Sequence, residues 1–95
     1  MFGNIDFNEM MKKLQESMAE QNNKIYTAKS GGGLVEASVN GQFEVVDLKI
    51  DDSLLEDKES LQILTMSAIN DAIKMAVEDK KQQAINMFGG LNLNQ

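Results

Sequence analysis

The chain is 95 residues long and 42% hydrophobic, which is the size of one domain (residues 1–95) with a thin core, and it contains no cysteine and no histidine. These two absences exclude disulfides, thiol nucleophiles, imidazole bases and the usual zinc ligands, so we expect a cytoplasmic protein with no cofactor, no metal and no enzymatic activity on a small-molecule substrate. Nine lysines, no arginine and fifteen acids give a net charge of −6, which disfavours a phosphate backbone as a partner, and no apolar run is long enough to cross a membrane.

The first predicted element is a helix over residues 6–25. Asp6 stands where its side chain can accept a hydrogen bond from the backbone N–H of Glu9, as at a helix N-terminus. Apolar residues then recur with helical spacing at Phe7, Met11, Leu14, Met18 and Ile25. This spacing is typical of a seam against another helix, and it is also compatible with an ordinary stripe that faces the core.

Residues 26–50 are expected to form a small antiparallel sheet. Apolar and polar residues alternate over two runs, as in the strands of a hairpin, at residues 35–39 and 46–50. We expect the turn at Asn40-Gly41, because both residues tolerate a positive φ. Residues 24–29 include β-tolerant side chains and are compatible with a third strand.

Three consecutive glycines, Gly31, Gly32 and Gly33, precede the first of these runs. A glycine-rich loop binds phosphate when its backbone amides converge at the N-terminus of a following helix. Here a strand follows, and neither the mononucleotide nor the dinucleotide signature is present. The glycines are therefore expected to allow a bend, a bulge or a close backbone approach.

An acidic segment, residues 51–60, leads from the sheet into a second helical region, residues 53–88, and carries five acids and one lysine. Ser53 and Glu56 have the spacing of a capping box, and acids at a helix start complement its partial positive charge. A divalent-cation site is the alternative, but the spacing and central glycine of a calcium loop are absent among Asp51, Asp52, Glu56 and Asp57. Capping is therefore favoured.

The second helix is expected to be long, because helical spacing of apolar residues continues from about residue 57 to residue 88. At 1.5 Å per residue it would span roughly 45 Å, more than a three-stranded sheet requires. Part of it is therefore expected to project or to meet another subunit. Gly89-Gly90 are expected to end the helix, and residues 89–95 to form a flexible tail.

The combination of these pieces resembles the YbaB/EbfC family of bacterial nucleoid-associated proteins. The most specific matches are Gly31 to Val35, Val39-Asn40-Gly41, Ile50-Asp51 with Ser53-Leu54-Leu55, and Asn70-Asp71-Ala72. The resemblance implies an α+β fold of N-terminal helix, small three-stranded antiparallel sheet and long C-terminal helix. It further implies a homodimer whose helical arms project like tweezers and which binds DNA and alters its conformation. Family members commonly have Asp-Pro where this chain has Asp51-Asp52, and many carry arginine on the helices.

The charge pattern by itself favours a solvated, ion-paired face, because most lysines of the two helices have an acid three or four residues away. With the resemblance, we expect the acids to lie at the body of a dimer and the lysines along its arms. The candidate DNA-binding residues are Lys12, Lys13, Lys24, Lys74, Lys80 and Lys81. The candidate dimer-interface residues are Val35, Ala37, Val46, Leu48, Leu61, Leu64 and Ala68.

The resulting hypothesis is a non-enzymatic, nucleoid-associated protein of the cytoplasm that binds double-stranded DNA as a homodimer, with little sequence specificity and with an influence on gene expression. No base-reading arrangement is visible in the sequence. The alternative is a protein-protein interaction module without direct DNA binding. Its adaptable apolar groove would be formed by Met10, Met11, Met18 and Met75.

Overall fold

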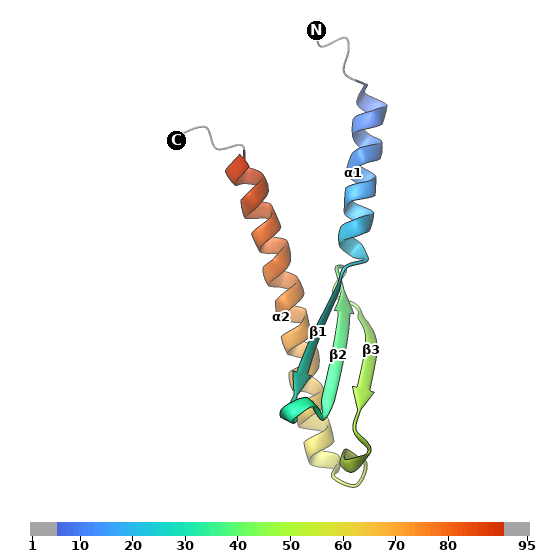
Figure 1. Ribbon diagram of the computed structural model, residues 1–95, viewed down its shortest axis with the longest axis vertical. Coiled ribbons are helices and arrows are strands. Elements are labelled where there is room, and N and C mark those ends of the chain that lie inside the picture. The colour runs from blue at the N-terminus through green and yellow to red at the C-terminus, as the bar shows by residue number, and fades with distance from the viewer. Residues whose placement is uncertain (1–5, 91–95) are drawn as a thin grey trace.

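The structure, a computed structural model, describes the backbone of residues 6–90 and the side chains of residues 6–87. A long helix packs along a three-stranded antiparallel sheet, and a shorter N-terminal helix extends beyond one end of the sheet (Figure 1), which confirms the expected α+β fold. In chain order the elements are α1 (Phe7–Asn22), β1 (Ile25–Ser30), the 3-10 turn η2 (Gly31–Gly33), β2 (Val35–Asn40), β3 (Val45–Ile50), the 3-10 turn η3 (Asp52–Leu54) and α2 (Lys58–Gly90).

Helix α1 begins where the sequence predicts, because Asp6 Oδ1 accepts hydrogen bonds from the backbone N–H groups of Asn8 (3.0 Å) and Glu9 (3.3 Å). It ends at Asn22, earlier than predicted, and Ile25 is the first residue of β1. No residue of α1 is buried, so its apolar stripe does not face the core of this chain. The core-facing interpretation of the stripe is therefore wrong, and its seam interpretation remains a prediction.

The sheet has the order β1-β2-β3, with Ala28 paired to Ala37 and Ala37 paired to Leu48. A bulge interrupts the second pairing, since Asp47 lies opposite Ser38 while Val45 lies opposite Val39. Directly paired residues share a face of an antiparallel sheet. The paired apolar residues of β3, Val45, Leu48 and Ile50, therefore lie on the same face as the apolar residues of β2.

The hairpin turn lies at residues 41–44, but its geometry differs from the prediction. The residue with a left-handed backbone is Phe43 (φ 65°), whereas Gly41 has no positive φ. The side chain of Asn40 shapes the turn by accepting from the backbone N–H groups of Gln42 (2.9 Å) and Glu44 (3.0 Å). Gly41 is required for a different reason, because a Cβ atom there would lie 2.0 Å from the carbonyl oxygen of Gln21.

The three consecutive glycines form the bend that the sequence predicts. All three have positive φ values, 62° at Gly31, 71° at Gly32 and 99° at Gly33, and they connect β1 to β2 through η2. Only glycine adopts this conformation repeatedly at low cost. Gly31 also lies against α2, since a Cβ atom there would be 2.5 Å from Cδ1 of Leu64.

The acidic segment caps two helical elements, although not through Ser53 as predicted. Asp51 Oδ1 accepts from the backbone N–H of Ser53 (2.8 Å) at the start of η3, and Asp57 Oδ1 accepts from that of Ser60 (3.2 Å) at the start of α2. Ser53 is therefore a capped residue and not the cap. Helix α2 continues to Gly90, so residues 89 and 90 belong to the helix, and residues 91–95 of the predicted tail lie outside the described residues.

The core lies between α2 and the first two strands. Three alanines of α2 spaced four residues apart, Ala68, Ala72 and Ala76, are fully buried and pack in two clusters against β1 and β2. The only large side chains with almost no exposure among the described residues are Val35 and Val39. Helix α2 covers β1 and β2, whereas every residue of β3 is exposed.

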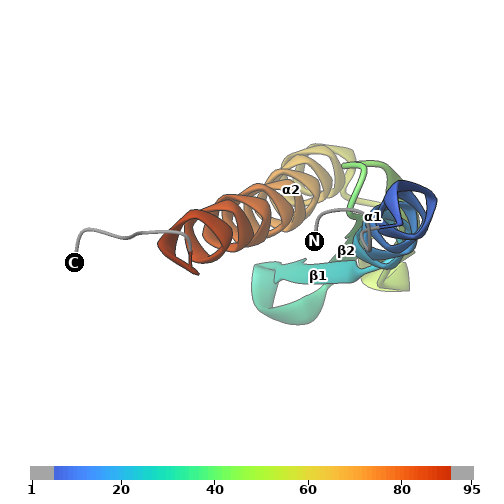
Figure 2. The ribbon, with the colours of Figure 1, turned by 90° about the horizontal axis from the view of Figure 1, so that it is seen from above.

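The molecule is elongated, with extents of 68 × 31 × 14 Å. Helix α1 and the distal part of α2 extend beyond the same end of the sheet (Figure 1), and seen from above the two helices diverge (Figure 2). No helix within residues 6–90 is both long and apolar enough to cross a bilayer. Two separate arms thus leave one sheet-centred body.

We expect Gly31→Ala to destabilise the protein more than Gly32→Ala. Both residues have left-handed backbones, which costs an alanine about 1–2 kcal/mol, but only the Gly31 substitution meets a neighbour, since the Gly32 position faces open space. Urea unfolding of the two variants at equal protein concentration measures the difference. Equal losses would show that the contact with Leu64 does not constrain the bend.

Candidate nucleic-acid interface

The two arms carry different charge. On α1 the exposed Lys12 and Lys13 share the helix with three acids, Glu9, Glu16 and Glu20. On α2, residues 80–90 contain two lysines and no acid. The distal part of α2 is therefore the more basic of the two arms.

The two lysines of this distal part differ in their surroundings. Lys81 is exposed, whereas Lys80 is half-buried with its Nζ 5.0 Å from the centre of the Phe43 ring. A cation over an aromatic face is attracted by the electrons of the ring. Lys80 therefore connects α2 to the β2–β3 turn, and Lys81 is the freer of the two cations.

Lys24 does not lie on an arm. It follows α1 and is not part of the helix, and its Nζ donates to Oδ2 of Asp79 at 2.8 Å. Within residues 6–87 this is the only ion pair between a lysine and a carboxylate. The charge of Lys24 is thus already balanced within the chain.

Lys74 also lies away from the arms. It is exposed on the part of α2 that packs on the sheet, between the buried Ala72 and Ala76. Of the six predicted DNA-binding lysines, the exposed ones on the arms are Lys12, Lys13 and Lys81.

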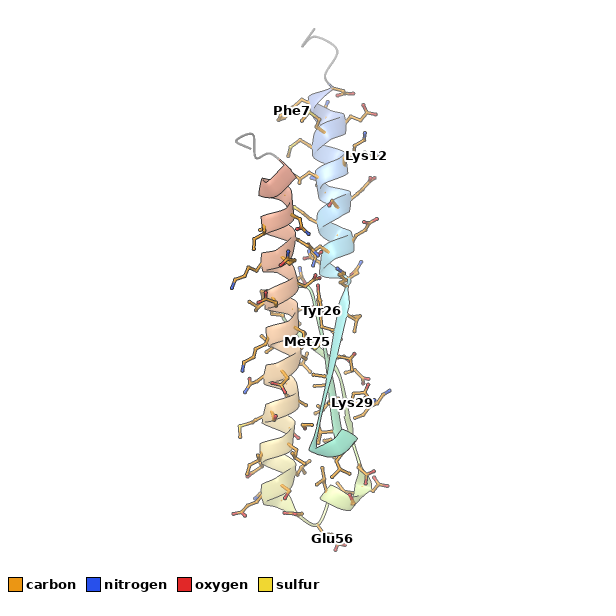
Figure 3. All side chains as sticks on the ribbon, turned by 60° about the vertical axis from the view of Figure 1, so that its left-hand side comes forward. Phe7, Lys12, Tyr26, Lys29, Glu56 and Met75 are labelled. Atoms are coloured by element: carbon orange, nitrogen blue, oxygen red, sulfur yellow. The ribbon has the colours of Figure 1, made fainter. Side chains whose placement is uncertain are left out.

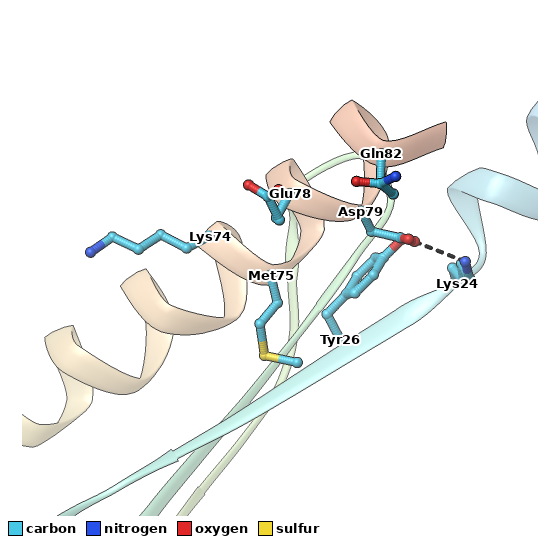
Figure 4. Close-up of a pocket in the computed structure, with 7 residues that line it drawn as sticks. All are labelled: Lys24, Tyr26, Lys74, Met75, Glu78, Asp79 and Gln82. Atoms are coloured by element: carbon cyan, nitrogen blue, oxygen red, sulfur yellow. Dashed lines mark hydrogen bonds and ion pairs between the residues drawn. The ribbon is translucent and has the colours of Figure 1, made fainter. Parts of the chain in front are cut away.

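A cleft of about 820 Å³ lies between α2 and β1 where the arms leave the body, lined by Lys24, Tyr26, Lys74, Met75, Glu78, Asp79 and Gln82. Lys24, Tyr26 and Asp79 converge at one end of it, and the ammonium group of Lys74 points away from them (Figure 4). The hydroxyl of Tyr26 donates to Oδ2 of Asp79 at 2.5 Å and accepts from Nε2 of Gln21 at 3.1 Å. A third donor to the same oxygen is Nε2 of Gln83, at 3.2 Å.

These contacts shift three pKa values. The hydrogen bonds from Lys24 and from Tyr26 hold the pKa of Asp79 below its ordinary value of 3.8. The hydrogen bond to Asp79 raises the pKa of Lys24 above 10.5. Burial, followed by the hydrogen bond to Asp79, raises the pKa of Tyr26 above 10.0. The sequence pattern gave no signal for this network, because Asp79 is more than fifty residues from Lys24 and from Tyr26 along the chain.

The acidic segment lies at the opposite end of the molecule from the arms. Glu56 stands at one end of the long axis, and Phe7 and Lys12 stand near the other (Figure 3). Within the described residues, no group of acids is arranged to hold a metal ion. The most acidic segment of the chain therefore lies away from the arms, although α1 carries three acids of its own.

The predicted dimer-interface residues divide into two groups. Val35, Ala37 and Ala68 are 0% exposed within the single chain and belong to its own core, so their role as interface residues stays a prediction. Val46 and Leu48 are exposed on β3, whereas Leu61 and Leu64 are half-buried on α2. Packing of one α2 over β1 and β2 explains the division, since it buries β2 and leaves β3 open.

A second cleft, of about 580 Å³, runs between β3 and α2 and is lined by Ile50, Leu61, Gln62, Thr65 and Met66. The hydroxyl oxygen of Thr65 is buried there and has no hydrogen-bond partner among the described residues. Ile50 and Met66 are not among the predicted interface residues. Ile50 could have been found from the alternation that identified Leu48, because it lies two residues further along the same strand face.

Comparisons with known proteins define the family. Residues 4–91 match the model of the YbaB/EbfC DNA-binding family, and the chain belongs to this family. A nucleoid-associated protein of Aliarcobacter butzleri is 52% identical over 92 residues, covering 93% of this chain and 87% of the relative. A nucleoid-associated protein of Nitratiruptor sp. is 56% identical over 83 residues, covering 87% of this chain and 78% of the relative.

A solved structure shows the same fold. The crystal structure of an uncharacterized protein from Helicobacter pylori matches with a TM-score of 0.71 and 50% sequence identity, covering 84% of this chain and 95% of that one. The expected family and fold are therefore both confirmed.

We expect Asp79→Asn to lower the melting temperature at pH 7, whereas Glu78→Gln, a neighbouring acid on the same helix, leaves it nearly unchanged. The lowered pKa of Asp79 means that its contribution to stability is complete above 3.8 and is lost as the pH falls through the folded-state pKa. The raised pKa values of Tyr26 and Lys24 mean that their contributions are lost at alkaline pH, above 10.0 and 10.5.

Thermal unfolding of wild type and both variants from about pH 3 to pH 11 measures the pH range over which these three groups stabilise the protein. The difference between wild type and Asp79→Asn should be largest near neutral pH and should shrink at both extremes. A difference that stays constant across the range would contradict the proposed network.

Proposed function

We propose that this protein binds double-stranded DNA as a homodimer, through its arms and with little sequence specificity. The observation that carries the proposal is the separation of charge along the long axis, with the acidic segment at one end and a basic, acid-free stretch of α2 at the other. Membership of a DNA-binding family supports the same conclusion. Binding at several points along a duplex would alter the conformation of the DNA and thereby influence gene expression.

The contact residues that we favour are Lys12, Lys13 and Lys81. Exposed lysines neutralise phosphates and release counterions, which is a sequence-independent source of affinity. Lys24 and Lys80 are less suited, because an Asp79 carboxylate and a Phe43 ring already hold their ammonium groups. Nucleoid association in the cytoplasm is proposed on the same grounds, since relatives about 50% identical carry the name nucleoid-associated protein.

Dimerisation is proposed through β3 and the adjoining face of α2. Val46, Leu48 and Ile50 are 50%, 39% and 36% exposed on β3, and Met66 on α2 is 58% exposed. A single chain thus leaves several large apolar side chains exposed beside the second cleft, and exposed apolar patches are a feature of association surfaces. A second copy would cover these side chains.

A protein-binding role is the second candidate, favoured by one observation. Met10, Met11 and Met18 are 55%, 41% and 57% exposed on α1, and no other element within residues 6–90 covers them. Flexible methionine surfaces adapt to different partners. This role becomes the better account if the protein fails to bind any duplex at the lowest salt concentration.

Lys81→Ala should weaken DNA binding and reduce its salt dependence, whereas Lys58→Ala should change neither. Both are exposed lysines of α2, but Lys58 lies at the acidic end. If the three favoured lysines of each chain neutralise one phosphate each, affinity of a dimer should vary with about the 5.4th power of salt concentration, and loss of Lys81 from both chains should reduce that slope to about 3.6.

Fluorescence anisotropy with two unrelated duplexes over a range of salt concentrations measures both quantities. The two duplexes should bind with similar affinity. Equal effects of the two substitutions would show that binding does not involve the arms.

Leu48→Glu should convert the dimer to a monomer, whereas Met87→Glu, an equally drastic change of an exposed residue on the distal part of α2, should not. The single chain tolerates both substitutions, because Leu48 is 39% and Met87 is 65% exposed. Sedimentation should give about twice the 10.5 kDa chain mass for wild type and for Met87→Glu. A dimeric Leu48→Glu variant, or a monomeric wild type at micromolar concentration, would contradict the interface.

A further inference from the structure

Helix α1 is held to the rest of the protein at one end only. None of its residues is buried, and within the described residues its hydrogen bonds to other segments come from its last turn. There the carbonyl oxygen of Asn22 accepts from the backbone N–H of Gly41 (3.1 Å), and Nε2 of Gln21 donates to the hydroxyl of Tyr26 (3.1 Å). The direction of α1 is therefore set by very few contacts.

The segments that hold the last turn of α1 are themselves in contact with α2. The hydroxyl of Tyr26 donates to Asp79, and the same carboxylate oxygen accepts from Lys24, the second residue after α1 (Figure 4). On the other side, the turn that contains Gly41 also contains Phe43, whose ring lies under Lys80 of α2. The root of α1 is thus connected to two consecutive residues of α2, at the point where α2 leaves the sheet.

Asp79 is the residue of α2 that accepts the hydrogen bonds of the first connection, the one through Tyr26 and Lys24. Its Oδ2 atom accepts three hydrogen bonds, from Lys24 at 2.8 Å, from Tyr26 at 2.5 Å and from Gln83 at 3.2 Å. Hydrogen bonds to an ionised carboxylate are stronger than those between neutral groups. The side chain of Tyr26 is 8% exposed and packs with Ala72 and Ala76, so the hydroxyl that links Gln21 to Asp79 is attached to a fixed ring.

We propose that Asp79 is a positioning residue for DNA binding, which sets the separation of the two arms by holding the root of α1 against α2. This inference rests on the proposed function. The lysines of the two arms belong to different helices, and their spacing matches that of phosphates on a duplex only if the helices keep a defined separation. Fixing that separation before binding reduces the conformational entropy lost on association.

The proposal makes an unusual prediction about charge. Asp79→Asn removes a negative charge and frees Lys24, so electrostatics alone predicts tighter binding to DNA. A positioning role predicts weaker binding, because the neutral amide holds Lys24 and Tyr26 less strongly and α1 samples more directions. Glu78→Gln is the matched control, since it removes the same charge from the adjacent residue, which is exposed.

The experiment combines duplex affinity with a distance between the arms. The chain has no cysteine, so Ser17→Cys on α1 and Ala84→Cys on α2, both exposed, provide unique sites for spin labels. Labelled chains diluted with unlabelled protein give the distance distribution within one chain by pulsed electron resonance. Asp79→Asn should broaden this distribution and weaken duplex binding about five- to tenfold, the loss of roughly one well-made hydrogen bond. Glu78→Gln should leave the distribution unchanged and should not weaken binding.

The proposal is overturned if Asp79→Asn leaves the distance distribution unchanged, or if it broadens the distribution without weakening binding. It is also overturned if both variants change affinity equally. The helical circular dichroism signal and the dimer mass show whether each variant folds. If Asp79→Asn does not fold, Tyr26→Phe takes its place, because it removes the hydroxyl that links Gln21 to Asp79 and keeps the buried ring. The same outcomes then apply to Tyr26→Phe. Failure of wild type to bind any duplex refutes the proposed function instead, and with it the positioning role, whereas an unchanged distance distribution in a DNA-binding protein refutes the positioning role alone.

Discussion

The close packing of α2 on β1 and β2 is the constraint on which the rest of the structure depends. Alanines at every fourth position allow the helix to approach the sheet closely, and the core they form is thin, because its fully buried large side chains among the described residues are Val35 and Val39. Burial of apolar surface is the main source of folding free energy, at about 25 cal/mol per Å². A single helix cannot also cover β3 or α1, so both expose apolar side chains.

The same constraint gives the molecule its projecting arms. The distal part of α2 extends beyond the end of the sheet, where no strand within residues 6–90 is present for it to pack against. Helix α1 lies beyond the same end of the sheet. Two helices without a shared core keep a defined angle only through contacts at their roots. Gly41 allows the β2–β3 turn to approach the end of α1 closely. Asp79 on α2 accepts hydrogen bonds from Lys24 and Tyr26, which follow α1 in the chain.

The distribution of charge matters more for a nucleic-acid partner than the net charge of −6. The acidic segment and the arms lie toward opposite ends of a molecule 68 Å long, whereas the screening length at physiological ionic strength is about 8 Å. Acids at the far end therefore contribute little repulsion to a duplex held by the arms. The acids on α1 are close enough to oppose binding, which leaves Lys81 and the distal part of α2 as the most favourable surface.

Local backbone preferences were sufficient for the sequence to determine the element types, the cap at Asp6, the bend at Gly31 to Gly33 and the length of the second helix. The family resemblance gave the complete order of elements. The sequence could not show which residues of the alternating pattern are buried and which are exposed. Ala37 and Leu48 are paired on the same face of the sheet, but α2 covers the strand of Ala37 and leaves the strand of Leu48 exposed. It also could not find the partners of Lys24, Tyr26 and Lys80, or the reason for Gly41, since each depends on segments that meet only after the chain has folded.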